Sequence, residues 1–172
     1  FEEVLKMDPN NLSAVASIAQ TYYDMKEFEK AKEYQRRYLQ ISPNERDPYY
    51  WIGVIDWATV YPQRMQVRKD LNIAFPPDVN RPGVLPVLPE KARAELAEKY
   101  TPLVEEGIQA LTKAIQLKPN DADAMAYLNL MYRERADLQA DEAAREADLK
   151  TADEWVEKAL NIRKAAAGEA PS

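Results

Sequence analysis

The clearest candidates for acid–base chemistry in this sequence are two pairs of adjacent acidic residues, Glu105–Glu106 and Asp141–Glu142. Neighbouring side chains on a helix point about 100° apart, so the carboxyl groups of such a pair do not face one another across a substrate. The chain contains no His and no Cys, which excludes thiol nucleophiles, imidazole bases and zinc sites built on those residues. We therefore predict that both pairs are solvated helix surface and that the protein is not an enzyme.

Cofactor and metal motifs are also missing from the sequence. The four glycines form neither of the glycine-rich patterns that cradle phosphates. The acidic segment NDADA, residues 120–124, lacks the glycine and the distal glutamate of a calcium loop and is typical of a helix cap. We predict no cofactor and no metal site.

The charge pattern argues against nucleic acid as a partner. The formal net charge is -6, and the Lys and Arg residues are dispersed among acids. The one basic run contains Arg64, Arg68 and Lys69, which we expect on a solvated helix face. No apolar run approaches the roughly 20 residues that a bilayer span needs. The chain begins at Phe1, within a predicted helix and without an initiator Met, so we expect a leader or anchor before it. The bacterial cytoplasm and periplasm both suit a chain without cysteine.

The elements that must position any site are helices, which repeat along the chain. Three segments share an apolar helix end, a Pro-Asn turn and a new helix: LKMDPNNLSAVASIAQTYYDM, LQISPNERDPYYWIGVIDWA and IQLKPNDADAMAYLNLMYRE. Pro9 and Pro43 are 34 positions apart, a period typical of helix-turn-helix repeats. Asn10 or Asn11, Asp47 and Asn120 are the expected N-caps of the helices that follow the turns.

These segments resemble the tetratricopeptide repeat family, in a bacterial-type protein with an insertion in its middle repeat. The first helix of that pattern falls on Val15, Ile18, Ala19 and Tyr22, and the second copy has Asp56 where the tyrosine belongs. The resemblance implies an all-α fold, an α-solenoid of helix-turn-helix repeats. It covers most of the chain outside a proline-rich stretch. The second and third hairpins are longer than the family pattern, so we predict that both are lengthened.

The interval between Pro43 and Pro119 is 76 residues, 42 more than one period. We predict one domain at 1–166, divided into a helix remnant at 1–7 and repeats at 10–42, 44–118 and 120–166, with an insertion at about 58–100 and a disordered tail at 167–172. In this arrangement the second hairpin continues outward and turns through the prolines. A competing count places a degenerate whole repeat here, because Pro77 again lies 34 positions after Pro43.

The resemblance also implies a binding surface, since the first helices of such repeats line a concave groove. The groove residues that we expect to contact a partner are mostly aromatic: Tyr23, Tyr50, Trp51, Trp57, Tyr127 and Arg133. Large rings suit an interface anchor. The alternative is that these rings are intramolecular core, covered by the chain's own insertion.

The segment IAFPPDVNRPGVLPVLPE, residues 73–90, is too apolar for a solvated linker. Prolines preset an extended conformation that loses little entropy on docking. We expect Phe75, Leu85 and Leu88 to pack onto a surface, either the chain's own groove or a partner's.

The sequence thus favours a non-catalytic scaffold or adaptor for a protein or peptide partner, acting through the aromatic groove and the proline-rich loop. The alternative is a structural accessory subunit that stays docked in a larger bacterial complex, membrane-associated complexes included. An enzyme is a distant third, and neither nucleic acid nor a membrane span in this chain is expected.

Overall fold

The computed structural model describes residues 1–76, 80–81 and 84–168, and these form seven α-helices and no strand. The helices are α1 (Glu2–Met7), α2 (Leu12–Asp24), α3 (Phe28–Ile41), α4 (Arg46–Asp70), α5 (Glu90–Leu117), α6 (Ala122–Leu138) and α7 (Glu142–Ala166). The predicted all-α fold is confirmed. Of the predicted disordered tail at 167–172, residues 169–172 lie outside the described residues.

Side-chain caps begin three of these helices. Asn11 accepts a hydrogen bond from the backbone N–H of Ala14 at 2.9 Å, as the sequence predicted. The other two predicted caps are each wrong by a residue or two. Helix α4 already begins at Arg46, so Asp47 lies inside it, and α6 is capped by Asp121 rather than by Asn120. Asp121 also receives two hydrogen bonds from Arg46, and this tie explains why it holds the cap.

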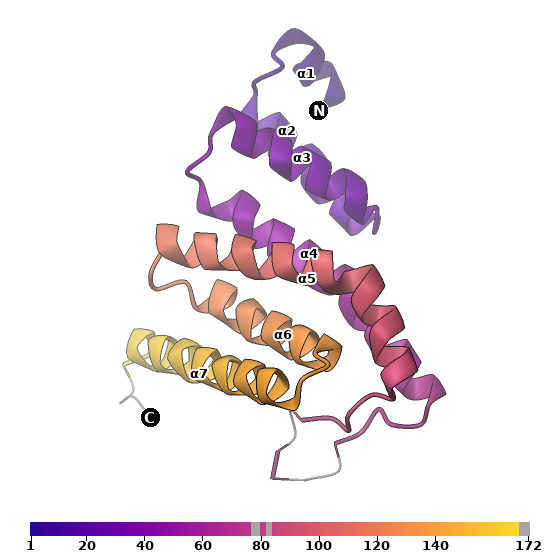
Figure 1. The fold of residues 1–172 in the computed structure, drawn as a ribbon. Coiled ribbons are helices and arrows are strands. Elements are labelled where there is room, and N and C mark those ends of the chain that lie inside the picture. The colour runs from indigo at the N-terminus through magenta and orange to yellow at the C-terminus, as the bar shows by residue number, and fades with distance from the viewer. Residues whose placement is uncertain (77–79, 82–83, 169–172) are drawn as a thin grey trace.

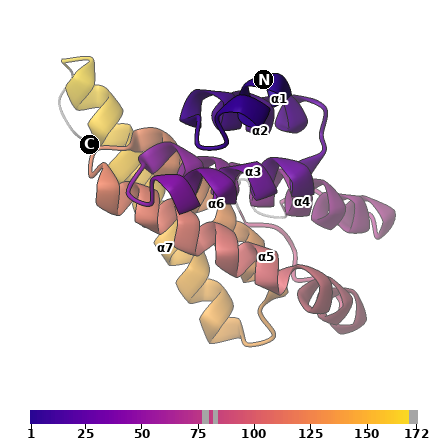
Figure 2. The same cartoon turned by 90° about the horizontal axis from the view of Figure 1, so that it is seen from above.

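Consecutive helices pack as antiparallel pairs, α2 with α3, α4 with α5 and α6 with α7, and the pairs stack into one elongated body (Figure 1). Successive pairs are turned relative to one another, so that α7 runs across the direction of α4 and α5 (Figure 2). The first pair has helices of 13 and 14 residues, whereas α4, α5 and α7 have 25, 28 and 25. The predicted α-solenoid with lengthened second and third hairpins is confirmed.

The long second hairpin depends on close contact between its two helices. A Cβ added at Gly53 on α4 would lie 2.3 Å from Cγ of Leu111 on α5, so only glycine fits there. Helix α4 runs without interruption through Pro62 and α5 through Pro102. Because α4 does not turn between Arg46 and Asp70, the competing count, which needs a helix–helix turn in that region, does not fit.

The segment that leads from the far end of the second hairpin into α5 passes the junction of α6 and α7 (Figure 1). Arg93 donates to the carbonyl of Leu138 at 2.9 Å, and Arg145 on α7 donates to the carbonyl of Leu85 at 2.8 Å. Leu88 packs on the chain itself, one of the two surfaces expected for it, since its side chain is 5% exposed and belongs to the main core. Phe75 by contrast is 82% exposed.

The basic run on α4 is not a solvated face, which corrects the expectation for Arg64 and Arg68. Both guanidinium groups are buried and pair with Glu134 and Asp137 on α6. The spacing of Arg64 and Arg68 is helical, as expected. The carboxylates that pair with them lie about 70 positions further along the chain, so the local sequence does not reveal the pairing. Lys69 is exposed. We call Arg64, Arg68, Glu134 and Asp137 the hairpin cluster.

The apolar core is divided in two. The larger part lies among α4, α5 and α6 and includes Val60, Val104, Leu111, Leu128 and Met131. The smaller part lies between α1, α2 and α3, around Leu5, Val15 and Ile18. None of the helices in the described part of the chain has the length and apolar composition that a bilayer span requires.

Candidate functional site

Seven aromatic rings from successive hairpins lie in continuous contact. In order of contact, the row is Phe28, Tyr23, Trp51, Tyr50, Tyr127, Trp57 and Tyr61, with ring centroids 4.9–5.8 Å apart. We call this set the aromatic row. Edge-to-face and stacked rings at such distances attract each other beyond the effect of burial alone. All seven side chains are half-buried or exposed, so the row is a surface as well as a packing unit.

The row follows from the helical spacing of its members. Tyr50 and Trp57 are seven residues apart, or two turns, and Tyr61 follows Trp57 by four residues, so the three lie along one face of α4, with Trp51 beside them. Tyr127 reaches the row from α6 and is edge-on to both Tyr50 and Trp57, with interplanar angles of 83° and 74°. The rings therefore join the first repeat to the third across α4.

Five of the six predicted groove residues belong to this row, and Arg133 does not. Arg133 lies on α6, where it donates to Asn129 of the same helix at 2.8 Å and to Asp153 of α7 at 2.7 Å. Sequence reasoning missed the two ends of the row, Phe28 and Tyr61. Tyr61 had a usable signal, because it lies one helical turn after Trp57. No pattern in the sequence pointed to Phe28.

A hollow of about 510 Å³ opens between the two ends of the row, where the α2–α3 turn faces the middle of α4. Four rings of the row line it, Tyr23, Phe28, Trp57 and Tyr61. The remaining wall residues are Asp24, Lys26, Ala58 and Pro62. We call this space the aromatic hollow.

The polar atoms of the row are strongly affected by burial. Burial, followed by the nearby Tyr127, raises the pKa of Tyr50 to about 12, and the same two causes raise the pKa of Tyr23. These hydroxyls stay protonated and act as neutral groups. The indole N–H of Trp57 is covered and has no hydrogen-bond partner among the described residues. Such a donor costs about 1–3 kcal/mol when left unpaired.

Behind the row, a second cluster of charges connects the first hairpin to the second. Lys32 on α3 donates to Asp56 on α4 at 2.9 Å and to Glu106 on α5 at 2.8 Å, and Arg36 donates to Glu106 at 2.6 Å. We call these four residues the interrepeat cluster. It explains the Asp56 that replaces the family tyrosine, because the carboxyl group is fully buried as a partner of Lys32.

One carboxyl group of the interrepeat cluster keeps its proton at neutral pH. Burial, together with a hydrogen bond to Glu106, raises the pKa of Asp56 to about 8 despite Lys32. Burial alone would raise the pKa of Glu106, but hydrogen bonds from Asp56, Lys32 and Arg36 lower it to about 2. The Oδ2 atom of Asp56 has no other partner, so we place there the proton that Asp56 and Glu106 share.

The acidic pairs examined for catalysis have structural partners. Glu106 belongs to the interrepeat cluster and Glu105 pairs with Arg135, so the expectation of a merely solvated face is wrong for both. Asp141 caps α7 by accepting from the N–H of Ala144. Within the described ranges, no group of three or more metal-ligating side chains is arranged to hold an ion.

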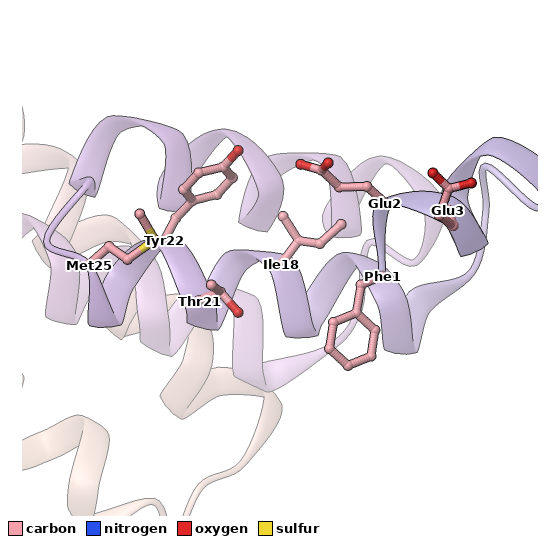
Figure 3. Close-up of a pocket in the computed structure, with 7 residues that line it drawn as sticks. All are labelled: Phe1, Glu2, Glu3, Ile18, Thr21, Tyr22 and Met25. Carbon is pink, nitrogen blue, oxygen red and sulfur yellow. The ribbon is translucent and has the colours of Figure 1, made fainter.

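A second hollow lies at the N-terminal end of the stack. It is lined by Phe1, Glu2 and Glu3 at the start of the chain, by Ile18, Thr21 and Tyr22 of α2, and by Met25 just after that helix (Figure 3). Phe1 and Met25 are 67% and 59% exposed. This end is apolar, but it carries no ring stack like that of the aromatic hollow.

The stacked antiparallel helix pairs define an α-solenoid, a class of helical-repeat scaffold. Residues 12–45, which contain α2 and α3, match the family described as "Tetratricopeptide repeat". This segment therefore resembles one tetratricopeptide repeat. Repeats of this kind typically serve as non-catalytic modules that bind other proteins.

Comparison with solved structures finds similar chains described as "Crystal structure of MamA" (20% identical, covering 97% of this chain and 86% of that chain, TM-score 0.33) and "MamA RS-1 ArsTM double mutant" (18% identical, covering 98% and 84%, TM-score 0.34). A further one is described as "Crystal structure of MamA protein" (21% identical, covering 97% and 81%, TM-score 0.32). No curated protein matches the chain.

Proposed function

We propose that the protein is a non-catalytic scaffold that binds a protein or peptide partner along the aromatic row. The observation that carries this proposal is a contiguous set of seven rings that are packed against one another yet left partly open, with a hollow between the two ends of the set. Aromatic side chains are enriched among the residues that dominate binding energy at interfaces. The row offers such anchors from three hairpins at once.

The test compares proteins retained from the native host by the immobilised chain and by two variants. Trp51→Ala removes a central ring of the row, and Phe1→Ala removes an exposed ring at the other hollow. We expect a near-stoichiometric partner on the intact chain and on Phe1→Ala, and its loss from Trp51→Ala. Circular dichroism must show that all three are equally helical. Retention of the partner by a folded Trp51→Ala chain would contradict the proposal.

A second candidate function is a structural subunit that stays docked in a larger complex through the end of the second hairpin. It is favoured by the large apolar side chains exposed there, Leu71 at 44%, Phe75 at 82% and Val87 at 68%. Permanent docking predicts that Phe75→Ser makes the isolated chain more soluble and abolishes co-purification of the complex. A scaffold that binds through the aromatic row predicts no loss of its partner in that variant.

A further inference from the structure

The aromatic hollow presents two pairs of rings to an occupant. Trp57 and Tyr61 are stacked, with centroids 4.9 Å apart and an angle of 21° between their planes, so each ring covers one face of the other and the pair presents ring edges and outer faces. Tyr23 and Phe28 form the other pair, tilted by 44° at 5.8 Å. Flat aromatic walls bind apolar groups that are themselves flat and rigid.

The charges around the hollow match an uncharged occupant. One carboxylate and one ammonium group, those of Asp24 and Lys26, stand in its wall and offset each other. A cation would be attracted to the ring faces, but the guanidinium of Arg64 already lies over the ring of Tyr61, 5.7 Å from its centroid. A foreign ammonium group would have to compete with this residue.

The size of the hollow favours an extended segment. Its volume is about 510 Å³, within the range of about 300–1,000 Å³ that is usual for ligand pockets. Along α4 the wall extends only from Trp57 to Pro62, a rise of roughly 8 Å at 1.5 Å per residue. A helical ligand needs anchors over at least two turns, about 11 Å. An extended peptide can fill the hollow with one or two residues.

The indole of Trp57 adds a polar requirement. Its N–H has no acceptor among the described residues, although the ring lines the hollow. A polyproline helix has no internal hydrogen bonds, so its carbonyl groups are available as acceptors. In this conformation the N–H is covered, so donation to such a carbonyl requires the indole to turn and expose it.

Building on the partner-binding role proposed above, we infer that the aromatic hollow binds an uncharged, proline-containing segment of a partner protein in the extended polyproline conformation. Proline rings pack on the stacked wall of Trp57 and Tyr61, and a carbonyl of the segment accepts from the indole. The preset backbone loses little entropy on binding, which suits a small contact.

The test is a calorimetric titration of the intact chain with decaproline, with both peptide ends blocked. We expect saturable binding that Tyr61→Ala weakens by at least about tenfold. Ala58→Arg, which fills the hollow without removing a ring, should weaken it as strongly, and both variants must keep the helical content of the intact chain. Phe1→Ala is the matched control and should leave the affinity unchanged.

Three results would overturn the inference. These are no binding of decaproline, equal binding by Ala58→Arg, and equal loss in Phe1→Ala. An amphipathic helical peptide of Leu, Ala and Lys serves as the second probe. If it binds through the row while decaproline does not, the hollow takes a helix, and the proposed scaffold function stands without this inference. If the captured partner is also indifferent to Trp51→Ala, the proposed function fails as well.

Discussion

Two buried ionic clusters have the same formal composition and different geometries. Each contains two cations and two carboxyl groups. In the hairpin cluster every carboxylate faces a guanidinium, and Arg68 donates to both oxygens of Asp137 at 3.0 and 2.7 Å. In the interrepeat cluster, Asp56 meets Glu106 as well as Lys32, and one of its oxygens lacks a partner. The charges of the hairpin cluster are paired without a bound proton, whereas the interrepeat cluster holds a proton on Asp56.

The difference follows from what each cluster joins. The hairpin cluster fixes the second half of α4 against α6, so that the lengthened hairpins pack as one body. The interrepeat cluster connects the first repeat, through α3, to α4 and α5. The long hairpins are thus held together by buried ion pairs and a large apolar core, in which burial raises the pKa of Glu134. The attachment of the first repeat includes Asp56, whose pKa is raised to about 8.

The largest effect is expected from breaking the hairpin cluster with Arg68→Met. The side chain of Arg68 is fully buried, so its loss leaves the carboxylate of Asp137 inside the protein with fewer donors. Removing one partner of a buried ion pair typically costs about 3–5 kcal/mol. Urea unfolding followed by circular dichroism should show a decrease of this size in the free energy of unfolding at pH 7.

The double variant Arg68→Met with Asp137→Leu is the control for this prediction. It also removes the carboxylate of Asp137, which has lost Arg68, and leaves Arg64 paired with Glu134. Most of the lost stability should therefore return. If the double variant were less stable than Arg68→Met, the cost would come from lost packing and not from an unpaired charge.

The next largest effect is a pH dependence caused by Asp56. Its pKa is about 8 in the folded chain against 3.8 for an ordinary aspartate, so between about pH 4 and pH 8 the folded state binds the proton that the unfolded state has released. Stability must therefore fall as pH rises through this window. A loss on the order of 2–4 kcal/mol between pH 5 and pH 8 is expected, measured by urea unfolding at each pH.

Asp56→Asn is the matched variant for the pH prediction. Its amide is neutral at every pH, can accept from Lys32 and can donate to Glu106, so it imitates the protonated acid. We expect stability close to that of the intact chain at pH 5 and higher than the intact chain at pH 8. A slope between pH 5 and pH 8 that is the same in both chains would show that Asp56 is ionised in the folded state.

The sequence predicted the architecture well, because repeat spacing is a local property. Pro9 and Pro43 marked the period, and Val15, Ile18 and Ala19 marked a helical face that is indeed buried. The aromatic row was largely predictable for the same reason, since Tyr50 and Trp57 lie on one face of one helix. A regular period thus carries information about both packing and surface.

The charge clusters were not predictable from local patterns. Arg64 pairs with Glu134, and Lys32 with Glu106, at sequence separations of 70 and 74. A charged side chain on a helix is usually solvated, and only the partner helix decides otherwise. The proline-rich segment left two surfaces open for Leu88, the chain's own and a partner's, because nothing in that segment specifies the core of α4, α5 and α6 that Leu88 joins.

A smaller effect, about 1–2 kcal/mol at pH 6, is expected from Lys32→Met. Met keeps an unbranched apolar stem in place of the buried lysine and removes only the ammonium group. At this pH Asp56 is neutral and Glu106 keeps Arg36 at 2.6 Å, so no carboxylate is stranded. The measurement is urea unfolding in parallel with Arg68→Met. Equal costs for the two variants would mean that the interrepeat cluster is fully ionised and that the two clusters do not differ.

The smallest effect is expected from Arg163→Ala, which removes an ion pair outside both clusters. Arg163 donates to Asp123 at 3.1 Å, but the two side chains are 52% and 70% exposed. Solvent and salt screen such a pair, and it contributes about 0–1 kcal/mol. Urea unfolding should place this variant within about 0.5 kcal/mol of the intact chain at low salt, and closer still in 0.5 M NaCl. A cost near that of Arg68→Met would mean that burial does not set the strength of the ion pairs in this protein, and the contrast between buried clusters and surface pairs would then fail.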